Sequence, residues 1–331
     1  MTHDFYAELA SLQQCPADGP PPGGLVSGFV DGCTTWFAAA EVERSAATND
    51  QQRKDADRKK NNARNCYMNR AVQRTLALPS DLRLEPWPPT LLHDSWLALE
   101  VEFKLLTPWY SKDDRPFHVL DNPVRKDRVF GVPFMSAASW KGMHRWACRM
   151  QAGLQAHFAN GKRFKEWDDP HWILHLFGNE KGEEKNFSQG ALVFSPTWFD
   201  KIGFEVINPH SRARRAGTQP IVYEVVPGRR PKGNSPNEHE EGGKGKLRLL
   251  YAPWPGMKPP ANPADFLPQL LEAIEQLLTC YGISAKRTVG WGTAEISKWC
   301  AWKKDKPVAE ESSREELVNK IRPWLESEAS A

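Results

Sequence analysis

Several common features are missing from this 331-residue sequence. No apolar run approaches the ~20 residues that a membrane-spanning helix needs, and Met1–Ala10 lacks the pattern of a signal peptide. The six cysteines are scattered, with no CxxC pair, no zinc-site spacing and no compact disulfide framework. These absences exclude a transmembrane protein, a zinc module and a small disulfide scaffold, and we expect a protein of the reducing cytoplasm.

A strong excess of charge is also missing. Lys and Arg number 44 and Asp and Glu 41, so the formal net charge is +3. Any nucleic-acid binding must therefore come from clustered basic residues. Neither a GxSxG elbow nor a recognisable Cys/His arrangement supports nucleophilic catalysis. Tryptophan, by contrast, is unusually frequent with 14 residues, and core packing is its default use.

The two ends of the chain differ in composition from its middle. A Pro- and Gly-rich stretch, residues 16–24, precedes a polar stretch of helical composition, residues 41–78, that is a solvated helix or a contact to nucleic acid or another subunit. A charged helix is predicted over residues 312–328, kinked or broken at Pro323. The predicted division is an N-terminal extension, residues 1–93, a globular domain, 94–303, and a C-terminal helix, 304–331.

The middle of the chain alternates strands and helices. In WLALEVEFKLL, from Trp96 to Leu106, every second residue is apolar, which predicts a half-buried strand. The other predicted elements are a helix over 137–158, a short helix over 167–176, strands over 191–194, 203–207, 221–226 and 244–251, a long helix from Pro263 to Gly282, and a strand over 293–299. A mobile loop is expected at 228–243. This order predicts an α+β protein with a ferredoxin-like (RRM-like) split βαβ core and inserted loops.

The most informative stretch runs from Phe117 to Arg149. A proline-marked loop carries Asp121, Arg125 and Lys126, and a helix follows in which basic residues recur every fourth position. Free backbone N–H groups and a lysine at a helix start make a ready anion site. The alternative is an amphipathic helix with a solvated basic face.

Two further basic stretches are candidates for phosphate binding. The turn Gly282–Gly292 places Lys286 and Arg287 among glycines that allow close backbone approach. The other stretch contains Arg212, Arg214 and Arg215, whose planar guanidinium groups suit phosphate recognition. A plain connecting turn and a solvated loop are the respective alternatives.

Several short motifs occur together in a characteristic order: DNPVRKD from Asp121, a Pro-Phe pair, SWKGxxR from Ser139, LFGN, a GALVF strand and a final GWG. In order and spacing they resemble the RAMP superfamily of CRISPR systems, in particular the crRNA-binding backbone subunits of type III effector complexes. The resemblance covers about residues 95–299. In place of the family's Pro-Gly before the Ser-x-Lys-Gly signature, this sequence has Ser136–Ala137.

The resemblance implies roles for particular residues. Asp121 falls where such subunits place the loop aspartate that cleaves target RNA. The signature that lies along the guide RNA is matched by Ser139, Lys141, Gly142 and Arg145, and Gly290 and Gly292 match the end of the glycine-rich turn. An aspartate of ordinary pKa, ~4, is a poor base at neutral pH, so we expect weakly held Mg²⁺, or a similar ion, at Asp121.

The implied function is a cytoplasmic crRNA-binding subunit of a type III CRISPR ribonucleoprotein in antiviral defense, a metal-dependent endoribonuclease toward guide-complementary target RNA. Its implied partners are crRNA, target RNA and other effector subunits, and no membrane. One alternative is a non-catalytic RAMP subunit that caps or bridges the complex. Another is a metal-independent crRNA-processing nuclease, which would need a histidine such as His118 or His144 as acid or base.

Overall fold

The computed structural model describes residues 32–80, 84, 86–114, 118–127, 129–179, 188–211, 216–232, 235–254, 257, 259 and 262–326. The chain divides into two compact units. The first unit combines Met1–Leu78 with Pro108–Phe134 and Trp198–Pro227, and the second combines Pro79–Thr107 with Met135–Thr197 and Gly228–Ala331. The predicted boundaries at residues 93 and 303 stay a prediction.

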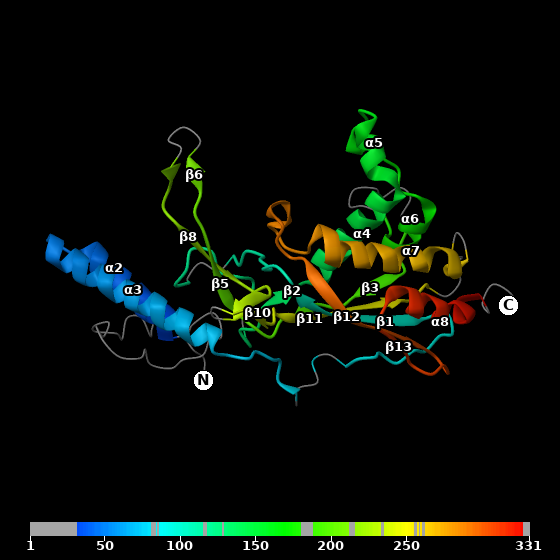
Figure 1. Cartoon of the computed structure of the whole chain (residues 1–331), viewed down its shortest axis with the longest axis horizontal. Helices are drawn as coiled ribbons and strands as arrows, with labels where there is room; N and C mark the ends of the chain where they lie inside the picture. The colour runs from blue at the N-terminus through cyan, green and yellow to red at the C-terminus, as the bar shows by residue number, and fades with distance from the viewer. Residues whose placement is uncertain are drawn as a thin grey trace. The chain divides into compact units, whose positions relative to one another are not determined.

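The second unit is built on a five-stranded sheet (Figure 1). Its strands, in spatial order, are β13 (Ala309–Glu311), β12 (Ala294–Lys303), β1 (Leu97–Leu105), β11 (Lys244–Tyr251) and β3 (Leu192–Phe194). Every neighbouring pair is antiparallel. Without the edge strand β13, this is the order of a ferredoxin-like βαββαβ unit, so the predicted α+β fold is confirmed.

The alternation in β1 explains the two faces of this sheet. Leu99, Val101 and Phe103 are buried, and Val101 pairs with Leu247 on one side and Trp299 on the other. The opposite face carries charges, because successive side chains point to opposite sides of a strand. There Glu100 accepts a hydrogen bond from Arg248 Nε at 2.6 Å.

Helices cover the apolar face of the sheet. Helix α4 (Ala137–Arg149) follows β1, and α7 (Pro263–Gln276) with the π-helical turn η5 (Leu277–Tyr281) precedes β12. Figure 1 shows α4 and α7 on the same side of the sheet. The short α6 (His171–Phe177) begins four residues later than the helix predicted over 167–176, after Pro170. It ends at Gly178, whose N–H donates to Leu174 O at 2.8 Å. None of the described helices is long and apolar enough to cross a membrane.

Three local predictions are corrected. The helix predicted over 137–158 is interrupted, because Gly153 (φ 104°) kinks the chain within η2 (Met150–Leu154) before α5 (Gln155–Ala159). Phe158, at the end of the predicted helix, is exposed. The expected loop 228–243 contains a hairpin of β9 (Arg230–Lys232) and β10 (Ser235–Glu240). Helix α8 (Arg314–Glu326) continues past Pro323 and buries Trp324 and Leu325.

The first unit contains a helical pair, α2 (Gly32–Ala46) and α3 (Asp50–Val72), and a β-hairpin of β5 (Gly203–Ile207) and β8 (Ile221–Val225). A second strand pair, β6 (His210–Ser211) and β7 (Ala216–Gly217), lies beyond it in the same hairpin. Helix α3 begins at Asn49, whose side chain accepts from Gln52 N at 2.9 Å.

Candidate functional site

The N-terminus of α4, in the second unit, is built as the sequence predicted. Ser136 caps the helix: its Oγ accepts from the Ser139 N–H at 3.2 Å and lies 2.9 Å from Ser139 Oγ. Lys141 lies in the first turns and has no acidic partner among the described residues. Partial burial, and then the nearby charge of Arg145, lower the pKa of Lys141.

Gly142 has no side chain, so it leaves a bare strip of exposed backbone on the solvent side of α4. A Cβ built at Gly142 would meet no atom within 4 Å, so the protein's own packing does not require glycine there. One helical turn further, Trp146 lies on the same face. The Arg287 guanidinium lies over the Trp146 ring, 4.3 Å from its centroid. The glycine-rich turn is therefore held beside the Gly142 face of α4.

The two glycines predicted at the end of this turn have different reasons to be glycine. Gly290 has a φ of +83° and open space around its Cβ position, so backbone conformation alone selects it. Gly292 also has a positive φ, and its Cβ would lie 2.4 Å from the Ser284 backbone nitrogen. Lys286 and Arg287 lie at the start of the short 3₁₀-helix η6 (Arg287–Val289), which directly precedes Gly290. We define the α4–turn surface as Ser139, Lys141, Gly142, Lys286 and Arg287.

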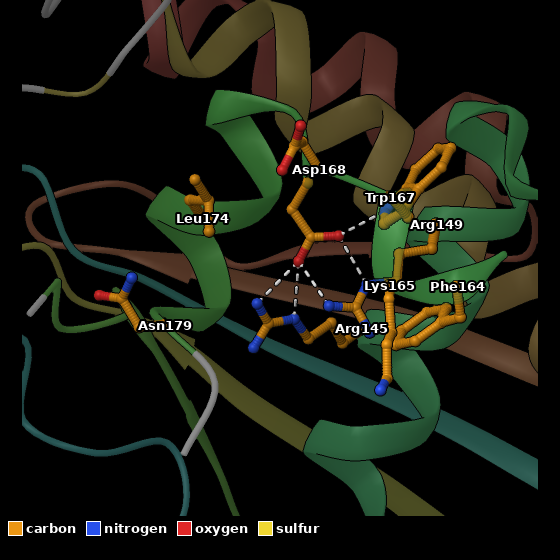
Figure 2. Close-up of a pocket in the computed structure, with 9 residues that line it drawn as sticks. Arg145, Arg149, Phe164, Lys165, Trp167, Asp168, Leu174 and Asn179 are labelled. Carbon is orange, nitrogen blue, oxygen red and sulfur yellow. Dashed lines mark hydrogen bonds and ion pairs between the residues drawn. The ribbon is translucent and has the colours of Figure 1, made fainter. Parts of the chain in front are cut away.

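The Arg145 side chain points toward Asp169. Its Nη2 and Nε donate to Asp169 Oδ2 at 2.7 and 3.0 Å, and Arg149 Nε donates to Oδ1 at 2.6 Å. The Trp167 indole N–H also donates to Asp169 Oδ1, at 2.8 Å (Figure 2). Burial alone would raise the pKa of Asp169, but the hydrogen bonds from Arg149, Arg145 and Trp167 lower it below 3.8. Arg145 and Asp169 both line a pocket on this side of α4.

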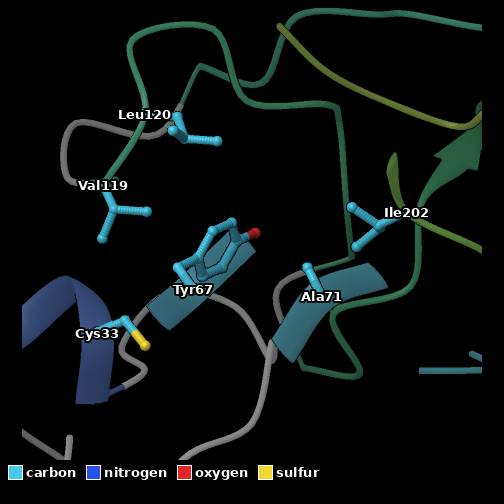
Figure 3. Close-up of a cluster of buried hydrophobic side chains, with 6 residues drawn as sticks. All are labelled: Cys33, Tyr67, Ala71, Val119, Leu120 and Ile202. Carbon is cyan, nitrogen blue, oxygen red and sulfur yellow. The ribbon is translucent and has the colours of Figure 1, made fainter. Parts of the chain in front are cut away.

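In the first unit, Asp121 projects from a loop that is fixed on both sides. Val119 and Leu120, just before it, are buried in a cluster with Tyr67 and Ala71 of α3 (Figure 3). Just after it, Asn122 O accepts from the Glu224 N–H at 3.0 Å. The Asp121 side chain itself is 88% exposed. An accessible carboxylate on a loop that is packed on both sides is well placed to meet a large ligand.

One cation accompanies this carboxylate. Arg64 Nη2 lies 3.8 Å from Asp121 Oδ1, and Arg64 Nε donates to Val119 O at 3.0 Å. The cation that the structure places beside Asp121 is therefore Arg64 of α3. Arg125 instead lies over the Phe134 ring, 5.7 Å from its centroid.

Lys126 does not occupy the position of an RNA contact. Its side chain is 1% exposed, and its Nζ donates to Glu224 Oε2 at 2.5 Å and to Tyr67 OH at 2.8 Å. Burial alone would raise the pKa of Glu224, but the charges of Lys126 and His118 outweigh this effect and lower that pKa. The predicted RNA contact of Lys126 is thus corrected: this ammonium compensates a buried carboxylate. Sequence reasoning missed Glu224 and Asp169, since neither belongs to a motif.

The remaining predicted residues give no support to a histidine-based nuclease. His144 is fully buried, its Nδ1 lies 2.8 Å from Trp140 O, and burial lowers its pKa to about 4. The His118 side chain is 3% exposed and lies 3.9 Å from Glu224.

The predicted phosphate-binding residues Arg212, Arg214 and Arg215 lie outside the described residues.

The donor atoms at Asp121 limit what metal could bind. Within the part of the chain that the structure describes, no group of three or more His, Cys, Asp or Glu side chains is placed to hold a metal ion. Mg²⁺, however, is commonly held by one or two carboxylates together with water and substrate phosphates. One exposed carboxylate, that of Asp121, fits such a donor set once phosphates are present.

Comparison with known proteins identifies one family. The profile of the RAMP superfamily matches residues 102–295, and no curated protein matches the chain. A chain of a type III-B Cmr-beta complex bound to cognate target RNA is similar in structure: 14% identity, 82% of this chain and 91% of that chain covered, TM-score 0.48. A chain of a CRISPR RNA-guided surveillance complex, pre-nicking, is similar over 65% of this chain and 78% of its own length, with 12% identity and a TM-score of 0.41.

Proposed function

Because the chain belongs to the RAMP superfamily, we propose that it is a crRNA-binding subunit of a type III CRISPR ribonucleoprotein effector. The observation that carries the proposal is the α4–turn surface. There, the bare strip at Gly142 lies beside the Arg287 guanidinium, with Lys141 in the same helical turns. A phosphate backbone can approach the helix closely at Gly142 and meet two cations.

Recognition of the guide on this surface is independent of base sequence. Lysine and arginine side chains contact phosphates and release counterions, while backbone N–H groups at the helix N-terminus add directed hydrogen bonds. Arg287 is already oriented by its stacking on Trp146. An oriented guanidinium loses little side-chain entropy on binding, which favours it over a freely rotating cation.

We further propose that Asp121 takes part in cleavage of target RNA. In such a reaction the 2′-hydroxyl attacks the adjacent phosphate and the 5′-oxygen leaves. Asp121 would orient the 2′-hydroxyl or accept its proton. Arg64, whose Nη2 lies 3.8 Å from Asp121 Oδ1, would stabilise the added negative charge on the phosphate. Mg²⁺ held by Asp121 and the RNA phosphates would supply charge neutralisation and a lower pKa for the attacking group.

A second candidate, a non-catalytic subunit that caps or bridges the complex, is favoured by the same ion pair. If the Arg64 guanidinium holds the carboxylate in place, Asp121 fixes the loop geometry and has no chemical role. The two candidates differ in one outcome. In a nuclease Asp121→Asn stops cutting, whereas in a cap it leaves the cutting by the assembled complex unchanged.

The test uses the complex reconstituted with crRNA. Parent, Lys141→Ala and Asp121→Asn subunits are compared for RNA affinity across a salt series and for cleavage in Mg²⁺ and in EDTA. We expect Lys141→Ala to weaken binding of unrelated RNA sequences alike and to reduce the salt slope by about 0.7. Asp121→Asn should bind normally and not cut. An unchanged affinity and salt slope in Lys141→Ala would remove the α4–turn surface as the guide site.

A further inference from the structure

A separate pocket of about 370 Å³ opens on the second unit at the C-terminal half of α4 (Figure 2). Its volume lies in the range of small-molecule sites. Arg145, Arg149 and Lys165 line it together with Phe164, Trp167 and two aspartates. None of the residues that define the α4–turn surface lines it.

Two cations of this pocket, Arg145 and Arg149, are held in place by the protein itself. Asp169, whose side chain is 3% exposed, binds both guanidinium groups through hydrogen bonds of 2.6 to 3.0 Å. Arg145 uses Nε and Nη2 in this contact, so its Nη1 is not engaged there. Three cations, Arg145, Arg149 and Lys165, face two carboxylates, Asp168 and Asp169, and a positive charge remains for an anion.

An ordered aromatic ring lies beside these cations. Phe164 is 45% exposed, and the Arg149 guanidinium lies 5.1 Å from its ring centroid. The turn that carries it, η3 (Phe164–Glu166), is held by Glu166 Oε2 accepting from the Arg163 N–H at 2.7 Å. Nearly half of this residue thus remains accessible on a pre-formed turn. Accessible aromatic side chains of this kind stack with flat π-systems such as nucleobases.

A ligand that satisfies both features joins an aromatic ring to an anion. We propose that this pocket binds a single nucleotide, with its base stacked on Phe164 and its phosphate held by Lys165 and Arg145. Asp168, which only accepts hydrogen bonds when ionised, suits a base with an amino group such as cytosine. The nucleotide is either free in solution or part of a bound RNA strand. The second case rests on the proposed function.

Binding of cytidine 5′-monophosphate to the full-length protein tests the free nucleotide by equilibrium dialysis. Phe164→Leu should weaken it about 5- to 150-fold, the range for loss of one stacked base, and Lys165→Gln should weaken it as well. Two matched controls lie outside the pocket: Phe158→Leu, an equally exposed phenylalanine, and Lys162→Gln, an exposed lysine. Both controls should bind like the parent.

A single-stranded RNA with 5-iodocytidine at successive positions tests the second source. After ultraviolet crosslinking and mass spectrometry, we expect adducts on the peptide that contains Phe164 and Trp167. If the nucleotide binds but RNA does not, the pocket stands and the proposed function fails. Two results would overturn the pocket proposal. In the first, RNA binds through Lys141, but the nucleotide does not bind and no crosslink forms at Phe164. In the second, Phe164→Leu and Lys165→Gln bind both ligands like the parent.

Discussion

Arg64 Nη2 lies 3.8 Å from Asp121 Oδ1, while Arg64 Nε donates to the carbonyl oxygen of Val119, two residues earlier in the same loop. One side chain of α3 thus contacts both the backbone that leads to Asp121 and the carboxylate itself. The Arg64 side chain is 32% exposed, so it can also reach a phosphate that approaches Asp121.

This arrangement predicts that Arg64→Gln impairs cleavage more than folding. The exposed ion pair contributes at most about 1 kcal/mol to stability, and the hydrogen bond from Arg64 to Val119 O contributes about 1 kcal/mol, so the urea midpoint should fall only modestly. Loss of the guanidinium should lower the cleavage rate of the reconstituted complex and leave its RNA affinity nearly unchanged. A fall in stability accompanied by unchanged cutting would assign Arg64 to the loop's structure alone.

Lys126→Met should destabilise the first unit without affecting RNA binding. Removing the ammonium leaves Glu224 buried without its cation, and breaking a buried ion pair costs about 3–5 kcal/mol. Denaturant unfolding measures the loss. The double variant Lys126→Met/Glu224→Leu removes both charges and should recover much of it. RNA affinity of the double variant should retain the parent's salt slope; a reduced slope would restore Lys126 to the RNA interface.

The Asp169 carboxylate predicts a dependence of stability on pH. Its folded-state pKa is lowered below 3.8. A group with a lowered folded-state pKa stabilises the protein above its unfolded value, and this contribution is lost as the pH falls through the folded value. Asp169→Asn should therefore be less stable than the parent at pH 7, by about 3 kcal/mol. The difference should shrink below about pH 4, as measured by denaturant unfolding across the pH series.

Gly142→Ala should raise stability and weaken RNA binding. Alanine stabilises a helix interior by about 0.5–1 kcal/mol relative to glycine, and the new methyl group meets no protein atom within 4 Å. A phosphate backbone lying on this strip would collide with it. Thermal unfolding and RNA affinity are measured on the same preparation. A variant that is more stable and binds RNA like the parent would show that no strand passes over Gly142.

Much of the architecture was predictable because it depends on local pattern. The alternation from Leu97 to Leu105 predicted β1 and its buried face, and the apolar stripe after Pro263 predicted α7. The predicted helix start at residue 137 is confirmed, since α4 begins at Ala137 after the Ser136 cap. These signals suffice because hydrophobic periodicity and capping act over a few neighbouring residues.

The sequence by itself determined the fold class, the family and the candidate residues Asp121, Lys141 and Gly142, since each belongs to a short pattern of neighbouring residues. Only the tertiary structure decided which charges are available. It paired Lys126 with Glu224, 98 positions away, and Arg145 with Asp169, 24 positions away. The physical reason is that a buried charge needs a partner in space, whatever the distance along the chain. A basic residue in a motif can therefore bind RNA or neutralise a carboxylate, and only its surroundings distinguish the two.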